Sequence, residues 1–321
     1  MLIFPLLSFF YSGGLYGDAS AAPSYNLTNF VHQSVLSGSP AVCRLAELPT
    51  HSIWVPLGPL RTQQQRRTSV FFGGEPSKVT IWDESSSALS VGKHLIAYGG
   101  QDAGLFRGAI IESGGMAEEW PYNVANMTAY MADLYQNLTD TLNITSTEVY
   151  SGSGLGPWLT VVDGDFLQDG PSESLAHSHF NPNVTVMYTT FTDEASVFLF
   201  GPAETIRTIE ILYPNVNAVG LPTSYEPLED DTESGLQYKR GVAFFTAAVE
   251  TSSRRLTVDT WAATLGAAPA YPARLNLLTL DAAPALGAYH SAELAFIFNN
   301  VDSAEHDNAQ LQETSLLTSR M

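Results

Sequence analysis

The sequence predicts an α/β fold. Val79–Trp82 is a short, β-branched run of the kind found in strands that are buried on both faces, and Val184–Phe191 is a second strand-like run. Directly after the first run, apolar residues recur at helical spacing from Ala88 to Ile96 and stop at Gly99–Gly100. The 321 residues, 45% of them hydrophobic, are enough for one such domain or for two smaller ones.

A polar turn, Asp83-Glu84-Ser85-Ser86-Ser87, joins the first strand to its helix. In α/β-hydrolases a strand, a sharp turn and a helix form the nucleophile elbow, written G-x-S-x-G. The elbow lifts a serine hydroxyl clear of the sheet and presents the next backbone N–H to the substrate oxyanion. Ser85 is therefore the candidate nucleophile, and the N–H of Ser86 is a candidate oxyanion donor.

The segments around this turn, GGEPSKVTIW, SVGKHLIAYGG and GLFRGAIIESGG, resemble the type-B carboxylesterase/lipase family, and within it the fungal secreted members. The family's elbow reads GESAG, so Glu84 and Ser85 match while Asp83 and Ser87 replace both glycines. The resemblance implies a single α/β-hydrolase domain over residues 1–321, with a mostly parallel central sheet flanked by helices. It also implies that the strands preceding the first one here are lacking.

Asp83 introduces a carboxylate near the place where negative charge develops during acyl transfer. At ~5 Å and an effective dielectric constant of ~20, the repulsion is roughly 3 kcal/mol. This corresponds to about a hundredfold in rate. The penalty shrinks if Asp83 points to solvent or is protonated.

Two further segments resemble family motifs that complete a catalytic triad. Thr192-Asp193-Glu194-Ala195-Ser196 is similar to N/T-D-E-G-T, which makes Glu194 the implied acid; a solvated turn is the alternative. The segment 287–293 is similar to G-x-x-H-x-x-E, which makes His290 the implied general base; a structural histidine is the alternative. The order Ser…Glu…His is that of α/β-hydrolases.

The first residues, MLIFPLLSFFYSGGLYGDASAA, allow two interpretations. An apolar block before Ala19-Ser20-Ala21 fits a signal peptide, although the basic start of such a peptide is lacking. Alternatively, YSGG followed by SYNLTNFV resembles the segment after the family's GGGF oxyanion loop, which makes residues 1–10 an internal strand. We favour the second interpretation because the resemblance continues through Tyr25-Asn26-Leu27.

On that alignment the family's three loop glycines correspond to Leu7, Ser8 and Phe9. The backbone N–H groups of Ser8 and Phe9 then join that of Ser86 as the expected oxyanion hole. Losing one such donor typically costs about 2.7–4 kcal/mol.

Other parts of the chain differ in how well they match the family. Residues 33–72 have no clean period of 2 or 3.6 residues and include a run of prolines and glutamines, so we expect an irregular segment there. Gln237–Glu250 and Arg254–Leu265 are expected to form two helices, and Ala270–Leu277 resembles a sheet strand.

The composition of the chain limits which kinds of partner it can bind and where in or outside the cell it is expected. A net charge of −19 with only 14 basic residues argues against nucleic acid and anionic membranes. No apolar run reaches the ~18 residues of a membrane span. A lone cysteine, Cys43, excludes an intrachain disulfide. Five N-x-S/T triplets and the resemblance favour a secreted glycoprotein; the acceptor residues are Asn26, Asn126, Asn137, Asn143 and Asn183.

Three hypotheses about function follow. The first is a serine esterase or lipase that hydrolyses small-molecule or lipid esters, for which the resemblance implies no metal and no organic cofactor. The second is a catalytically impaired relative that keeps the fold and binds partners. The third is a truncated gene product without function. The sequence does not specify the acyl chain, the leaving group or the oligomeric state.

Overall fold

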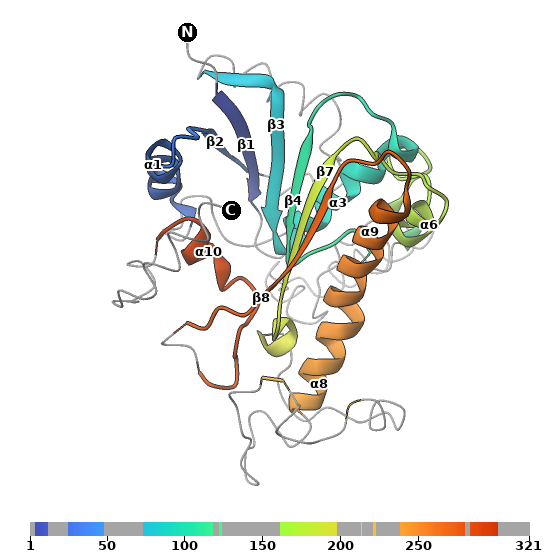
Figure 1. Ribbon diagram of the computed structural model, residues 1–321. Coiled ribbons are helices and arrows are strands. Elements are labelled where there is room, and N and C mark those ends of the chain that lie inside the picture. The colour runs from blue at the N-terminus through green and yellow to red at the C-terminus, as the bar shows by residue number, and fades with distance from the viewer. Residues whose placement is uncertain are drawn as a thin grey trace, which may run out of the picture.

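A computed structural model describes residues 4–11, 25–47, 73–117, 122–123, 161–197, 213, 221–222, 238–279 and 283–300. Within these ranges a six-stranded sheet has the order β2-β1-β3-β4-β7-β8 (Figure 1). Every neighbouring pair in it is parallel. Its strands are β1 (Phe4–Tyr11), β2 (Val42–Glu47), β3 (Gly74–Glu84), β4 (Gly108–Glu112), β7 (Thr185–Phe191) and β8 (Ala270–Leu275). A separate short pair joins β5 (Tyr122–Asn123) to β6 (Val161–Val162).

Helices cover both faces of the large sheet. Figure 1 shows α3 (Ser85–Gly100), α6 (Pro171–Ala176) and α9 (Ser252–Ala263) on one side, with α1 (Thr28–Leu36) and α10 (Glu293–Ile297) on the other. A short 3₁₀ turn, η3 (Glu194–Val197), follows β7. The predicted α/β-hydrolase architecture, a mostly parallel sheet flanked by helices, is confirmed. No helix in the described ranges combines the length and apolar character needed to cross a bilayer.

The two faces are packed with different side chains. On the α3 side, Leu95 and Ile96 pack against Ile81, Ile111 and other aliphatic residues that are almost fully buried. On the opposite side, aromatic rings dominate, and Trp82 meets both Phe9 and Phe298 edge to face at centroid distances of 5.1 and 5.3 Å. Because both faces are covered, β3 and β4 need nearly continuous apolar sequences. This explains the strong strand pattern of Val79–Trp82.

The N-terminal residues form an internal strand. β1 lies between β2 and β3, and its residues from Leu6 to Phe9 are paired on both sides. The interpretation of this segment as a strand therefore describes Phe4–Tyr11 correctly. The expected irregular segment 33–72 is regular at its start, because α1 continues to Leu36 and Val42–Glu47 forms an edge strand. Residues 48–72 lie outside the described ranges.

The two expected helices after residue 237 form one continuous rod. α8 (Tyr238–Phe245) passes into a π-helical turn, η4 (Thr246–Thr251), and then into α9. In Figure 1 this rod runs from below the sheet along its edge. Trp261 of α9 donates from Nε1 to the carbonyl of Val184 at 3.1 Å, and Ser253 accepts from the hydroxyl of Tyr188 at 3.2 Å. These bonds attach α9 to β7 and to the residue just before it.

Candidate active site

Ser85 stands at a sharp turn where β3 ends and α3 begins. Its φ is +58°, a left-handed value that a side chain with a Cβ adopts at a cost of about 1–2 kcal/mol. Such strain persists only where the surroundings enforce it, and it is concentrated at functional sites. The turn has the backbone conformation expected of a nucleophile elbow, although the flanking glycines are replaced.

Ser85, Glu194 and His290 meet at the carboxyl ends of the strands. Nε2 of His290 lies 2.7 Å from Oγ of Ser85, and Nδ1 lies 2.7 Å from Oε2 of Glu194. These contacts join residues 205 and 96 positions apart in the chain. In the tautomer with the proton on Nδ1, that N–H donates to the carboxylate and Nε2 is left to accept from the serine hydroxyl.

Glu194 is held rigidly. Its side chain is fully buried, and its Oε1 accepts from the backbone N–H of Phe191 at 2.5 Å. The next residue, Ala195, donates from its backbone N–H to Oγ1 of Thr246 in the π-helical turn at 3.2 Å. One carboxylate oxygen is therefore fixed by the backbone while the other faces His290.

A second carboxylate reaches the imidazole of His290. Oε1 of Glu84 lies 3.2 Å from Nε2 and also accepts from the hydroxyl of Ser291. Burial opposes the charged imidazolium, but the carboxylates of Glu84 and Glu194 outweigh that effect and raise the pKa of His290 to about 10. The pKa of Glu84 is itself raised, because burial outweighs the attraction of His290. Sequence reasoning matched Glu84 to the family but gave it no role.

More buried acids lie behind the site. Burial raises the pKa of Glu112 to about 8, even though Oε2 accepts from Nε1 of Trp82 at 2.6 Å. Glu293 is fully buried, neither of its oxygens has a hydrogen-bond partner among the described residues, and burial raises its pKa well above the usual range. Nothing in the sequence separated these acids from surface glutamates, although both stand inside matched segments.

One further cluster near the site has donor atoms suited to a cation. Glu194, Glu250 and His290 each place one such atom within 4.8 Å of the others. Both ring nitrogens of His290 already contact Glu194 and Ser85, so a metal ion would have to displace one of these contacts. The arrangement fits a hydrogen-bonded triad better than a metal centre.

Comparison with known proteins identifies the family. A model of the carboxylesterase family matches residues 66–321. The chain belongs to the carboxylesterase family. It is 27% identical to a secreted lipase of Arthroderma benhamiae, in an alignment covering 91% of this chain and 60% of that protein. It is 28% identical to secreted lipase 1 of Botryotinia fuckeliana, covering 72% and 47% respectively.

The chain therefore spans about half to three-fifths of the length of these two relatives. Among solved structures, EstA of Aspergillus niger matches with a TM-score of 0.68 and 21% identity, over 92% of this chain and 64% of that one. At this identity the likeness shows the shared α/β-hydrolase fold alone.

In the elbow of this chain, side chains replace the two glycines of the carboxylesterase pattern, and these side chains are not exposed. Asp83 and Ser87 are both almost completely buried. Oδ1 of Asp83 accepts from the backbone N–H of Glu84 at 2.8 Å, yet burial raises the pKa of Asp83 well above its usual range. A charged Asp83 was expected to repel the negative charge that develops during acyl transfer, unless its side chain were exposed to solvent or protonated. The burial of Asp83 excludes solvent exposure and favours protonation.

The segment after β4 closes the elbow from the other side. Ser113 has a φ of +49°, and Gly114 packs so tightly that an added Cβ would lie 2.0 Å from the carbonyl oxygen of Ser85. Only glycine fits at this distance. The Glu112–Gly115 segment therefore helps to set the position of Ser85.

The prediction that Ser8 and Phe9 belong to the oxyanion loop is wrong. Both residues lie inside β1, where Ser8 is paired with Arg44 of β2 and Ile81 of β3. A strand with a bonded neighbour on each side uses its backbone N–H groups in the sheet, so they cannot face a pocket. The residues that follow β1, from 12 to 24, lie outside the described ranges.

The predicted role of Ser86 as an oxyanion donor stays a prediction. Ser86 is the second residue of α3, at the amino-terminal end of the helix. Asn26 and Asn183 are exposed, and Nδ2 of Asn183 donates to Asp102 at 3.1 Å. The other three acceptor residues, Asn126, Asn137 and Asn143, lie outside the described ranges.

Proposed function

We propose that this chain is a serine carboxylic-ester hydrolase that works through an acyl-enzyme. The observation that carries the proposal is the continuous contact from Ser85 through His290 to Glu194, with 2.7 Å at each step. The left-handed backbone at Ser85 supports it, because the same strained turn characterises nucleophile elbows.

In the proposed reaction, neutral His290 takes the proton of Ser85 as Oγ attacks the ester carbonyl. The tetrahedral intermediate then collapses, and the leaving alcohol receives that proton from Nε2. Water attacks the acyl-enzyme with His290 again as the base, and the acid leaves as Ser85 regains its proton. Glu194 holds the imidazole in the required tautomer and stabilises its positive charge throughout.

The oxyanion requires hydrogen-bond donors other than the backbone N–H groups of Ser8 and Phe9, which are used in the sheet. We assign one to the N–H of Ser86, at the positive end of α3. Each donor of this type contributes about 2.7–4 kcal/mol to transition-state stabilisation.

The proposed substrates are lipid esters or small carboxylic esters, and the proposed location is extracellular. Two similar fungal proteins are named secreted lipases, and the chain carries five glycosylation triplets, of which Asn26 and Asn183 are exposed. Hydrolysis of p-nitrophenyl esters from acetate to palmitate would separate an esterase from a lipase. Endoglycosidase digestion of the protein secreted by a fungal host would test glycosylation.

The deciding experiment is labelling with a fluorophosphonate ester at pH 9, followed by peptide mapping. We expect modification of Ser85 in the parent protein, none in Ser85→Ala, and retained labelling in the control Ser86→Ala, which keeps the backbone N–H. Labelling that persists in Ser85→Ala would move the nucleophile to Ser86 or Ser87. A folded parent protein that does not react would refute the hydrolase proposal.

A second candidate, an impaired relative that binds esters without turnover, rests on the altered elbow. Asp83 and Ser87 fill positions that are glycines in the family, and both are almost completely buried. This candidate predicts that a fluorophosphonate-resistant protein still binds a slowly hydrolysed ester. Isothermal titration with a non-hydrolysable phosphonate monoester would detect such binding.

A further inference from the structure

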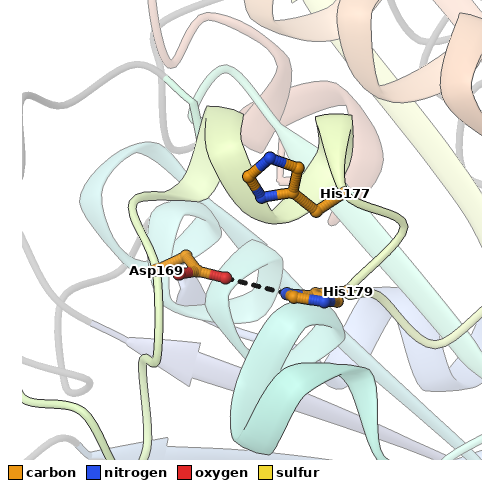
Figure 2. Close-up of side chains that lie close together, drawn as sticks. All are labelled: Asp169, His177 and His179. Carbon is orange, nitrogen blue, oxygen red and sulfur yellow. Dashed lines mark hydrogen bonds and ion pairs between the residues drawn. The ribbon is translucent and has the colours of Figure 1, made fainter.

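A second cluster of chemically active side chains lies away from the triad, around the short helix α6. Asp169 precedes this helix, and His177 and His179 follow its last turn. Figure 2 shows the three side chains converging, with the carboxylate of Asp169 directed at the ring of His179 and the ring of His177 above it. The triad mechanism uses none of the three.

The backbone at both ends of α6 is fixed by local hydrogen bonds. At its start, the carboxylate of Glu173 accepts from the N–H of Gly170 at 3.2 Å. At its end, the N–H of His179 donates to the carbonyl of Ser174 at 2.7 Å, and that of Ser178 donates to Leu175 at 3.2 Å. These two bonds form a Schellman motif, which requires a left-handed residue between the two histidines.

Ser178 supplies that left-handed residue, with a φ of +61°, at a position where glycine is usual. The reversal of the chain at Ser178 brings His179 back towards Asp169. As a result Nδ1 of His179 lies 2.8 Å from Oδ2 of Asp169. The two imidazole rings are 5.8 Å apart between centroids and inclined by 57°, so they do not stack.

The geometry is close to that of a three-ligand metal site. One donor atom from each of Asp169, His177 and His179 lies within 4.8 Å of the others. Ligand atoms at ~2.1 Å from a metal ion are about 3.0–3.4 Å apart in tetrahedral or octahedral coordination. The exposed histidine side chains have to rotate to close this difference.

We propose that Asp169, His177 and His179 bind a divalent transition-metal ion such as Zn²⁺ or Ni²⁺. Two imidazoles and one carboxylate suit these ions, whereas Ca²⁺ and Mg²⁺ require oxygen ligands. Three protein ligands leave coordination positions for water, and the net charge of −19 favours the approach of cations. The ion replaces the direct Asp169–His179 hydrogen bond as the link between the two ends of α6.

The proposed role is structural. His179 is followed by Phe180, whose ring packs on Trp261 with a centroid distance of 4.3 Å, and the chain then enters β7. An ion at this cluster ties the residue before α6 to the segment that leads into β7. We expect it to raise the stability of the fold and to leave the chemistry at Ser85 unchanged.

The test is metal binding measured on the full chain, without a histidine tag, after treatment with EDTA. Isothermal titration with ZnCl₂ should show one site in the parent protein. That site should weaken at least tenfold in His177→Ala, in His179→Ala and in Asp169→Asn. His32→Ala, which removes an exposed histidine elsewhere, should bind as the parent does. His290→Ala, which dismantles the donor cluster at the triad, should also keep the site.

Thermal melting gives an independent measurement. Excess Zn²⁺ should raise the melting temperature of the parent and of His32→Ala by a few degrees, and should not raise that of the double variant H177A/H179A. Unchanged affinity in the double variant, or no binding at ~1 mM Zn²⁺, would overturn the proposal. Loss of the site in His290→Ala alone would place the ion at the triad and would also overturn it.

Discussion

Oε1 of Glu84 lies 3.2 Å from Nε2 of His290, the same nitrogen that contacts the hydroxyl of Ser85. The residue preceding the nucleophile thus shares the nitrogen that the nucleophile needs. A carboxylate there stabilises the imidazolium that forms during attack, but it also favours the protonated ring before attack begins, when a neutral base is required.

This relationship predicts an alkaline pH profile. With the pKa of His290 at about 10, the neutral base becomes available only as the pH rises, so kcat/KM should increase up to about pH 10. Glu84→Gln removes the charge and should lower the midpoint of this rise by about 1–3 pH units. Rate measurements on an activated ester from pH 6 to 11 test this, with Glu75→Gln as the control. A midpoint that stays in place in Glu84→Gln would remove Glu84 from the electrostatics of the site.

The buried acids predict that the fold weakens as the pH rises. The pKa of Glu112 is raised from 4.5 to about 8, so the folded state holds a proton that the unfolded state releases. The resulting stability is present below pH 4.5 and is lost as the pH rises through about 8.

Glu112→Gln should make this pH dependence shallower by up to about 1.4 kcal/mol per pH unit. The amide oxygen of the variant still accepts from Trp82, so the packing is kept. Urea unfolding at pH 5, 6.5 and 8 measures the effect, and the exposed Asp259→Asn serves as the control. Equal slopes for Glu112→Gln and the parent would show that Glu112 ionises normally in the folded protein.

Gly114→Ala should disable the site by displacing the elbow. The new Cβ would lie 2.0 Å from the carbonyl oxygen of Ser85, so the backbone that carries the nucleophile must move. A displacement of this kind can lower kcat/KM by about 100-fold. Gly164→Ala introduces a Cβ at a φ of +80° with no neighbour within 4 Å, so it should strain the backbone but leave activity intact. Equal activities of the two variants would contradict the proposed role of Gly114.

Asp83→Asn should leave the rate at neutral pH nearly unchanged. Burial favours the neutral carboxyl group, so the amide replaces an uncharged group of the same shape. If Asp83 were ionised, the same variant should be about a hundredfold faster, because a repulsive charge would have been removed. Steady-state kinetics at pH 7 decide between these outcomes. Asp83→Gly should lower the melting temperature because it empties a buried position.

The sequence was sufficient to predict the three residues that meet at the site. Ser85, Glu194 and His290 each stood in a separate local motif, and each motif lay at the end of a recognisable strand or before a helix. The central strands were equally predictable, because burial on both faces requires the apolar runs that the sequence displays.

Other features of the fold and the site could not be predicted, because they depend on contacts between residues that are far apart in the sequence. The assignment of Ser8 and Phe9 to an oxyanion loop failed because nothing in this apolar run shows where the strand ends, and both residues lie inside β1. Glu112 and Glu293 could not be distinguished from surface acids, since charged residues are seldom buried. β2 was missed because an edge strand with one bonded neighbour has little alternation to detect.

The π-helical turn between α8 and α9 sets the rotational phase of the longer helix. A π turn holds one residue more than an α turn, and each residue of an α-helix advances the rotation by about 100°. Deleting a single residue between positions 246 and 251 would therefore swing Ser253 away from Tyr188 and Trp261 away from Val184. The alignment of α9 with β7, the strand that leads to Glu194, therefore depends on the one extra residue in the π turn. The identity of that residue's side chain does not matter for this effect.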